Sequence, residues 1–385
     1  MRFAPCASWG FSPLDRELGL LPGSPLLPRA QEMLVQLATQ IPFAAASRLF
    51  ETWTGIKLGS STTRRQTLAA GEALVAGETA AAEWVLRDSP EPTAAGVEHQ
   101  QLSIDGAMVP LIGEWAEVKT LAVGTVTERS GGEPKATDLS YFSRLCDHRT
   151  FTRLATVETH RRATELARQV TVVVDGAEWL QDFADIQCPQ ATRIIDWTHS
   201  SEYVAAAARA LFGEPDALAA WRQAQLHELW EGDPELVLTE LCERLTALSP
   251  NSEAAAVVSG SILYLARRLE QLQYARFRAE GRPTGSGCVE SANKLIVEAR
   301  LKGAGMHWRR ENVNPMLALR NTYCSANRWS GGWALLDRYR CARSGELARA
   351  QHQARNPTPS PPPSRPRKRN WRQFSLRPRP RHAKP

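Results

Sequence analysis

Apolar residues within residues 29–95 recur three and four positions apart, which is the spacing of one face of a helix. The pattern predicts a helical region whose short helices are joined by Gly and Ser/Thr turns. Residues 60–67 supply N-cap side chains before a further helix, and they include Arg64 and Arg65. The region is either a helix-turn-helix in which both arginines face DNA phosphates, or a plain helical bundle.

A different pattern follows in residues 96–199. Apolar residues at 102–104 and 115–125 indicate two strands joined around residues 110–113, with room for a third. The continuous run Val-Thr-Val-Val-Val at 170–174 is typical of a strand buried on both faces, and residues 191–196 resemble it. Helical segments at 149–168 and 177–185 separate these strands. The order predicts an α/β fold with a mixed sheet covered by helices.

Residues 200–284 are nearly all helical in pattern and form a predicted insertion, after which residues 285–350 return to the core with two more helices. At the two ends of the chain we expect an irregular arm in residues 1–28 and a disordered tail in residues 351–385. The tail is rich in Pro and Arg and cannot bury enough apolar surface to fold.

The charge of the chain is unevenly distributed. The 385 residues carry a formal net charge of +6, but residues 356–385 hold nine Lys/Arg and no acid, which leaves −3 for residues 1–355. Local basic clusters, rather than the overall pI, must therefore support any argument for nucleic-acid binding.

The sequence also bears on the compartment. No apolar run reaches the ~18 residues of a membrane span, and the N-terminus lacks the apolar stretch of a signal peptide. The seven cysteines are scattered and form no C-x-x-C pair, which favours a reduced compartment over a disulfide or zinc framework. We therefore expect a cytoplasmic protein with no membrane partner.

Three acidic residues are the main candidates for chemistry. Asp105 and Asp175 each follow a predicted strand and precede Gly, and Glu290 opens the helix-like stretch after the insertion. Each has an ordinary explanation alone, because Asp-Gly is a common turn and an acid in the first helical turn is favoured by the helix dipole. Together they are the oxygen ligands that Mg²⁺ or Mn²⁺ prefers, and two ions about 4 Å apart can clamp a phosphoryl transfer.

Asp196 and His199 lie three residues apart where the last strand meets a helix. Asp196 caps this helix, binds metal or holds the junction together, and His199 is placed to support the site from behind its ligands.

A basic segment comes directly after Glu290. Residues 300–310 combine four Lys/Arg with a His and a Trp around two glycines, which suits phosphate contact and base stacking, although a solvated loop gives the same composition. The candidate DNA contacts in this part of the chain are Lys294, Arg300, Lys302, His307, Trp308, Arg309 and Arg310.

These motifs, in this order, resemble those of an insertion-sequence transposase of the ISKra family, within the Mutator-like group of RNase H-fold DDE transposases. The resemblance runs from about residue 10 to residue 329. It rests on residues 10–20, 105–119, 175–179, 195–199 and 287–308.

The resemblance implies an RNase H-like mixed sheet with an all-helical insertion. Asp105, Asp175 and Glu290 would form a catalytic triad that holds two Mg²⁺ or Mn²⁺ ions, while the Asp-x-x-His motif falls on Asp196 and His199. It also implies metal-dependent DNA cleavage, attack of the freed 3′-OH on target DNA, and a homo-oligomer on DNA.

Two alternatives remain open. Members of the family carry a cysteine-paired element near the N-terminus, of which only Cys6 is present. In the first alternative, the chain is therefore a truncated, transposition-inactive remnant that still binds DNA. A glycoside hydrolase with two carboxylates is the other alternative, but the basic stretch after Glu290 suits phosphate better than sugar.

Overall fold

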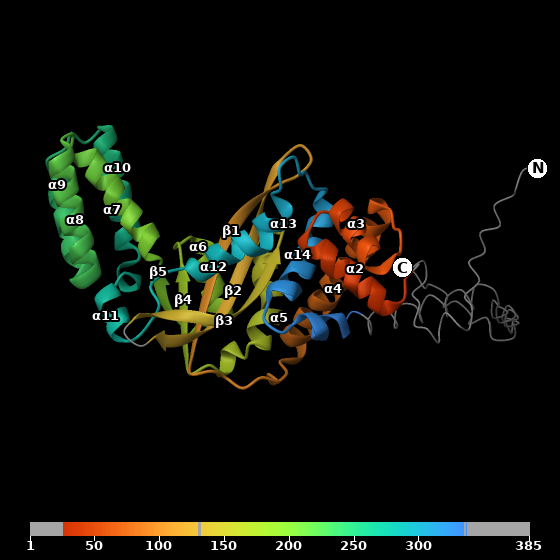
Figure 1. The fold of residues 1–385 in the computed structure, drawn as a ribbon. Helices are drawn as coiled ribbons and strands as arrows, with labels where there is room; N and C mark the ends of the chain where they lie inside the picture. Colours follow the sequence, from red (N-terminus) through yellow and green to blue (C-terminus); the bar gives the residue numbers. More distant parts are fainter. Residues whose placement is uncertain (1–25, 130–131, 335, 337–385) are drawn as a thin grey trace, which may run out of the picture. The chain divides into compact units, whose positions relative to one another are not determined.

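The computed structural model describes residues 26–129, 132–334 and 336. Contacts divide the chain into residues 1–341 and 342–385, and every described residue belongs to the first unit (Figure 1). The predicted tail and nearly all of the predicted arm lie outside the described residues. None of the helices in the described ranges has the length and apolar character needed to cross a bilayer.

Three helices, α2 (Pro28–Gln40), α3 (Phe43–Thr54) and α4 (Ser60–Asp88), form the predicted N-terminal helical region. The prediction of short helices was wrong for α4, which runs for 29 residues. Gly59 occupies its N-cap position, and the predicted cap residues from Ser60 onward are part of the helix itself. Arg64 and Arg65 are exposed on the surface of α4.

The long helix α4 reaches the rest of the protein through a close contact with α14 (Arg310–Cys324). A Cβ atom at Gly71 would come within 2.2 Å of the carbonyl oxygen of Pro315, so only glycine allows the two helices to approach this closely. The apolar side chains of α4 and α14 form a shared cluster beside this contact.

A five-stranded mixed sheet forms the centre of the described chain, with strand order β3-β2-β1-β4-β5. The first three strands in the sequence pair antiparallel, whereas β4 lies parallel to both β1 and β5. The predicted α/β class with a mixed sheet is confirmed, including a third antiparallel strand. The strands are β1 (His99–Pro110), β2 (Trp115–Arg129), β3 (Gly132–Arg144), β4 (Gln169–Val174) and β5 (Thr192–Ile195).

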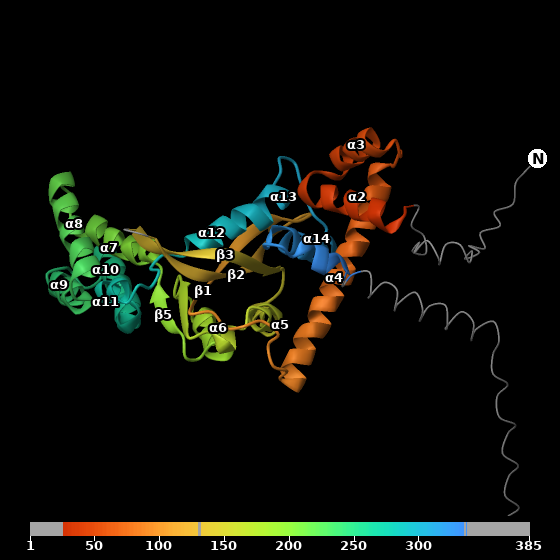
Figure 2. The same cartoon turned by 60° about the horizontal axis from the view of Figure 1, so that its bottom comes forward.

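Helices cover both faces of the sheet because successive strand residues point to opposite sides. Leu102 and Ile104 pack with α5 (His148–Arg161) and α6 (Glu178–Gln187). The alternate position Ala107 packs on the other face, which the C-terminal helices cover (Figure 2). These are α12 (Gly287–Ala292), a π-helical turn η3 (Asn293–Glu298), α13 (Ala299–Leu301) and α14.

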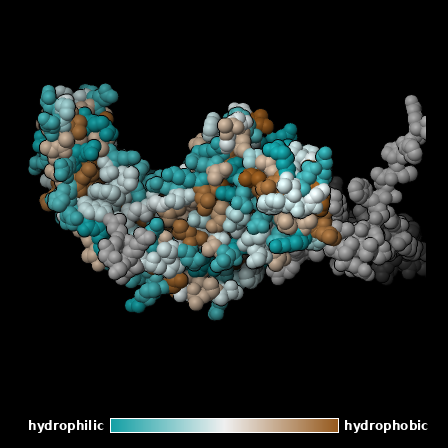
Figure 3. All heavy atoms as spheres, viewed as in Figure 1, coloured by the Kyte–Doolittle hydropathy of each residue, from teal (hydrophilic) through white to brown (hydrophobic). Residues whose placement is uncertain are grey.

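The segment between β5 and α12 is helical, as predicted, and its apolar side chains form a cluster that also includes residues of β4 and β5. It attaches to the strand ends through Tyr274, whose hydroxyl donates to the carbonyl oxygen of Ile195 at 2.9 Å. Its helices are α7 (Trp197–Leu211), α8 (Pro215–Glu231), α9 (Pro234–Thr246), α10 (Glu253–Ala266) and α11 (Tyr274–Ala279). On the face seen in Figure 3, hydrophobic residues form small groups among hydrophilic ones.

Candidate active site

Asp105, Asp175 and Asp196 lie on or directly after neighbouring strands of the sheet. Ser103 of β1 pairs with Val173 of β4; two residues further along the chain are Asp105, still within β1, and Asp175, which directly follows β4. Val174 pairs with Ile195 of β5, so Asp196 follows beside Asp175. The parallel strands therefore bring these acids, which lie far apart in the sequence, to one edge of the sheet.

The position of Asp105 differs from the prediction in one respect. It lies in the middle of β1 rather than at its end, because β1 continues to Pro110 as a hairpin with β2. The pairing of β1 with β4, however, ends at Ser103. Asp105 thus faces the open end of β4, which is the property that the prediction required.

The carboxylate of Asp105 has both hydrogen-bond donors and negative charges around it. The backbone N–H of Gly106 donates to Oδ1 at 2.7 Å, and Nδ2 of Asn293 donates to Oδ2 at 2.9 Å. Burial raises the pKa of Asp105, and the charges of Asp175 and Glu290 raise it further against these two hydrogen bonds. Asp105 is therefore within electrostatic reach of both Asp175 and Glu290.

Asp175 directly follows β4, as predicted, and its Oδ1 accepts a hydrogen bond from the N–H of Ala177 at 2.9 Å. Gly176 adopts a left-handed φ of +83°, and a Cβ atom there would lie 2.6 Å from Arg268. The helical segment holds this turn from outside. The Tyr264 hydroxyl donates to the carbonyl oxygen of Asp175 at 2.6 Å, and Arg268 Nε donates to that of Gly176 at 3.0 Å.

Glu290 is exposed in the first turn of α12, on the sheet face that Asp105 also occupies. Its charge reaches Asp105 although the two residues are 185 positions apart in the sequence. Glu290 thus lies where a third ligand could approach the two strand acids.

Asn293 lies beside Asp105 and was not selected from the sequence. Its side chain is buried, and its Oδ1 atom has no hydrogen-bond partner among the described residues. Asn293 begins the π-helical turn η3, a conformation that often marks functional sites. The one signal available in the sequence was its spacing of three residues from Glu290, which places both on one helical face.

Asp196 has a structural position. Its carboxylate accepts the N–H of His199 at 3.1 Å, which caps α7, and the N–H of Ser286 at 2.7 Å. It is only 6% exposed, and it joins the end of β5 to the segment that enters α12. His199 contacts the rings of Tyr203 and Tyr264, the second of which also holds Asp175.

The donor set fits a hard divalent cation that keeps part of its water shell. Two neighbouring carboxylates and the unpartnered Asn293 oxygen supply the oxygen ligands that Mg²⁺ and Mn²⁺ prefer. Within the described ranges, no three His, Cys, Asp or Glu side chains converge closely enough to enclose one ion.

The predicted DNA contacts fall into two groups. Arg300 and Trp308 are buried at 2% and 7% exposure, which is a correction to their predicted place on a DNA-binding surface. The Trp308 indole N–H donates to the carbonyl oxygen of Leu301, and the Trp308 backbone forms an isolated bridge with Leu111 at the turn between β1 and β2. The other candidates are at least partly exposed: Arg64, Arg65, Lys294, Lys302, His307, Arg309 and Arg310.

Comparison with known proteins gave no further indication. The chain matches no protein-family model, and it matches none of the curated proteins.

Proposed function

We propose that this chain is a metal-dependent enzyme that cuts and joins DNA, a transposase of the RNase H-fold DDE type, as its resemblance to the ISKra family implies. The observation that supports the proposal most directly is that Asp105 lies beside Asp175 at one edge of the sheet and that the charges of Asp175 and Glu290 both act on it. The strand order β3-β2-β1-β4-β5, with a helical insertion before the third acid, supports the RNase H-like assignment.

In this proposal Asp105, Asp175 and Glu290 hold the two divalent ions. Bound ions would neutralise the negative charge that develops on the scissile phosphate and would lower the pKa of a bound water. Asn293 orients the Asp105 carboxylate through its 2.9 Å hydrogen bond. Asp196 fixes the entry to α12, and with it the position of Glu290.

The exposed cations after Glu290 would contact the DNA backbone. Arg309 is exposed, and Lys294 projects from the same π-helical turn as Asn293. Such contacts position a strand without reading its sequence, so the protein would hold phosphates near the carboxylates through these residues. A homo-oligomer on paired element ends is part of the proposal.

The proposal is tested by incubating the full chain with Mg²⁺ or Mn²⁺ and DNA that carries the flanking ends of its element. We expect nicks at the element ends that Glu290→Gln abolishes, while Glu243→Gln, an exposed acid on α9, cuts like the wild type. Cleavage by Glu290→Gln would contradict the assignment. Binding without cleavage by the wild type would favour the alternative of an inactive DNA-binding remnant.

A further inference from the structure

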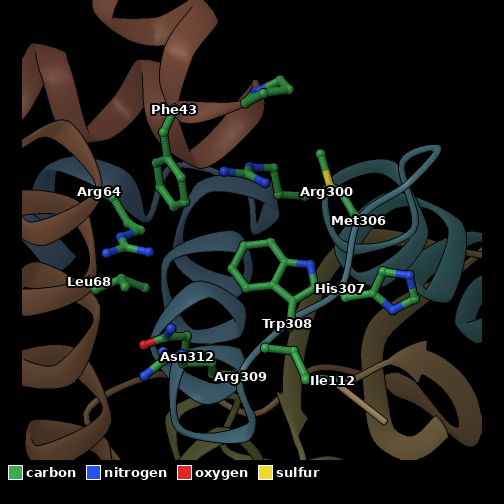
Figure 4. Close-up of a pocket in the computed structure, with 11 residues that line it drawn as sticks. Phe43, Arg64, Leu68, Ile112, Arg300, Met306, His307, Trp308, Arg309 and Asn312 are labelled. Atoms are coloured by element: carbon green, nitrogen blue, oxygen red, sulfur yellow. The ribbon is translucent and has the colours of Figure 1, made fainter. Parts of the chain in front are cut away.

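A pocket of about 290 Å³ lies between the N-terminal helices and the extended β1–β2 hairpin (Figure 4). Phe43 comes from α3 and Arg64 from α4, whereas Arg300 and Trp308 come from the segment after η3. The hydrogen bonds of the Asp105 carboxylate go to Gly106 and Asn293 and involve none of these four residues. The pocket is thus built from other residues than the candidate active site.

The pocket contains cations without acids. Arg64, Arg300 and Arg309 line it together with His307, and none of its eleven lining residues is Asp or Glu. Arg64 and Arg309 are exposed at its rim, while Arg300 is buried. A site with this composition attracts a negatively charged group.

Arg300 differs in its partners from two other arginines that lie largely out of solvent, Arg144 and Arg328. Arg144, also 2% exposed, forms an ion pair with Glu78, and Arg328 forms one with Glu158. Arg300 Nε donates only to the carbonyl oxygen of Ala38, and one guanidinium nitrogen, Nη2, has no partner among the described residues.

A second cation near Arg300 makes the burial of its positive charge less favourable still. Burial, together with the smaller effect of the neighbouring Arg320 cation, lowers the pKa of Arg300 to about 10. Arg320 is itself buried and donates to the carbonyl oxygens of Thr39 and Leu295. A buried cation with an unused donor is costly unless an anion compensates it.

The remaining wall of the pocket is apolar and aromatic. The Arg300 guanidinium lies 4.8 Å from the ring centre of Phe43 and 5.3 Å from that of Trp308. Leu68, Ile112 and Met306 complete the apolar lining. Flat aromatic groups pack favourably against such walls, and guanidinium planes stack on them as well.

We propose that this pocket binds one nucleotide, with its base against the apolar wall of Phe43 and Trp308 and its phosphate on Arg300, Arg64 and Arg309. The chemistry required is an aromatic ring joined to an oxyanion, and a volume near 300 Å³ is at the small end of ligand pockets. The nucleotide is either free or part of a DNA strand. Only the second source rests on the proposed function.

The test is isothermal titration of the full chain, in chelator, with thymidine 5′-monophosphate, thymidine and inorganic phosphate. We expect saturable binding of the nucleotide and much weaker binding of either half. Arg64→Glu should weaken nucleotide binding about tenfold or more, because it replaces a charge-assisted contact with repulsion. Arg48→Glu on α3 is the matched control, since this exposed arginine does not line the pocket, and it should bind like the wild type.

Three results would overturn the inference: no binding of the nucleotide, phosphate binding as tight as that of the nucleotide, or equal losses in Arg64→Glu and Arg48→Glu. Arg300→Lys adds a check on the buried partner, because lysine keeps the charge but loses the planar fork. It should weaken nucleotide binding, and its thermal unfolding shows whether the fold is intact. Wild-type affinity in folded Arg300→Lys would contradict the role given to Arg300.

Competition separates the two sources. A ten-nucleotide single strand that displaces the mononucleotide identifies a nucleotide within DNA, whereas displacement by free nucleotides alone identifies a free one. The same titration on Glu290→Gln keeps this inference apart from the proposed function. If the wild type binds the nucleotide but cleaves no DNA, the proposed function is contradicted and the nucleotide pocket is not. If it cleaves DNA but binds no nucleotide, the pocket proposal is contradicted and the proposed function is not.

Discussion

Asp105 and Glu158 are carboxylates that the protein withdraws from water, but the charges around them are opposite. Burial alone would raise the pKa of Glu158, yet the cations of Arg328 and Arg161 outweigh it and hold the pKa below its ordinary value. Burial raises the pKa of Asp105, and its neighbours Asp175 and Glu290 raise it further. The cations that compensate the charge of Glu158 are residues of the protein itself. The charges that act on Asp105 are negative, so a compensating cation would have to come from outside the chain.

This difference separates a structural ion cluster from a functional one. Glu158 joins α5 to the segment after α14 through Arg328, with oxygen–nitrogen distances of 2.5 and 2.7 Å. Such a fully satisfied cluster specifies packing. Like charges held together at a strand edge cost stability, and they persist where a site needs them.

The largest expected effect is on catalysis. Asp105→Asn and Asp175→Asn should each lower DNA cleavage by about 10³-fold, since a lost metal ligand removes several kcal/mol of transition-state stabilisation. Cleavage rates on element-end DNA measure the loss, and Asp216→Asn on α8 is the exposed control. Wild-type activity in Asp175→Asn together with inactivity in Asp196→Asn would reverse the assignment of the second ligand.

The next largest expected effect is on stability, through the ion cluster around Glu158. Arg328→Ala should lower the free energy of unfolding by about 3–5 kcal/mol, because it leaves the buried carboxylate of Glu158 without its main partner. Urea unfolding measures this loss. The double variant Glu158→Gln with Arg328→Met should recover much of it, and a loss below about 1 kcal/mol in Arg328→Ala would show that the pair matters little.

Asp196 gives a smaller and mainly structural effect. The N–H groups of His199 and Ser286 bind different oxygens of Asp196, and Asp196→Asn replaces one of these oxygens with an NH2 group, so one backbone N–H faces a donor and loses its partner. The expected loss of unfolding free energy is about 1–2 kcal/mol. Chemical denaturation checks it, and an unchanged stability would mean that the junction does not depend on both bonds.

The smallest effect has the opposite sign. When folding raises the pKa of an acid, the folded protein loses stability as the pH rises through that pKa. Because the pKa of Asp105 is raised, Asp105→Asn should stabilise the metal-free protein at neutral pH. We expect a rise in Tm of about 2 °C that fades as the pH falls toward 4. For Glu158 the sign is reversed, because its lowered pKa contributes stability that is lost in acid. A lower Tm in Asp105→Asn at pH 7 would contradict the account of its surroundings.

The sequence predicted those parts of the fold that local pattern determines. The β-branched run at 170–174 gave β4, and the long helical stretch gave the insertion. The pattern could not show where β1 ends, because Asp105-Gly106 resembles a turn and only pairing with β2 keeps the strand extended to Pro110. The π-helical turn at Asn293 likewise depends on packing against the sheet, which no local signal records.

The site was predicted in the same uneven way. The three acids could be selected because each follows an apolar run or opens a helix in the sequence, although Asp105 lies in the middle of its strand, and the parallel pairing brings the two strand acids together. The fate of Arg300 and Trp308 could not be foreseen, since a basic, Gly-rich stretch looks like a surface loop until Phe43 of α3 covers it. Tertiary contacts between distant segments decide which cations remain on the surface.

The most direct test of the central claim is Mn²⁺ binding to the full chain, followed by electron paramagnetic resonance. If the carboxylate edge exists to hold divalent ions, the wild type and Asp216→Asn bind Mn²⁺ alike, and Asp105→Asn loses most of this binding while it remains folded. Equal Mn²⁺ affinity in Asp105→Asn and the wild type would contradict the claim.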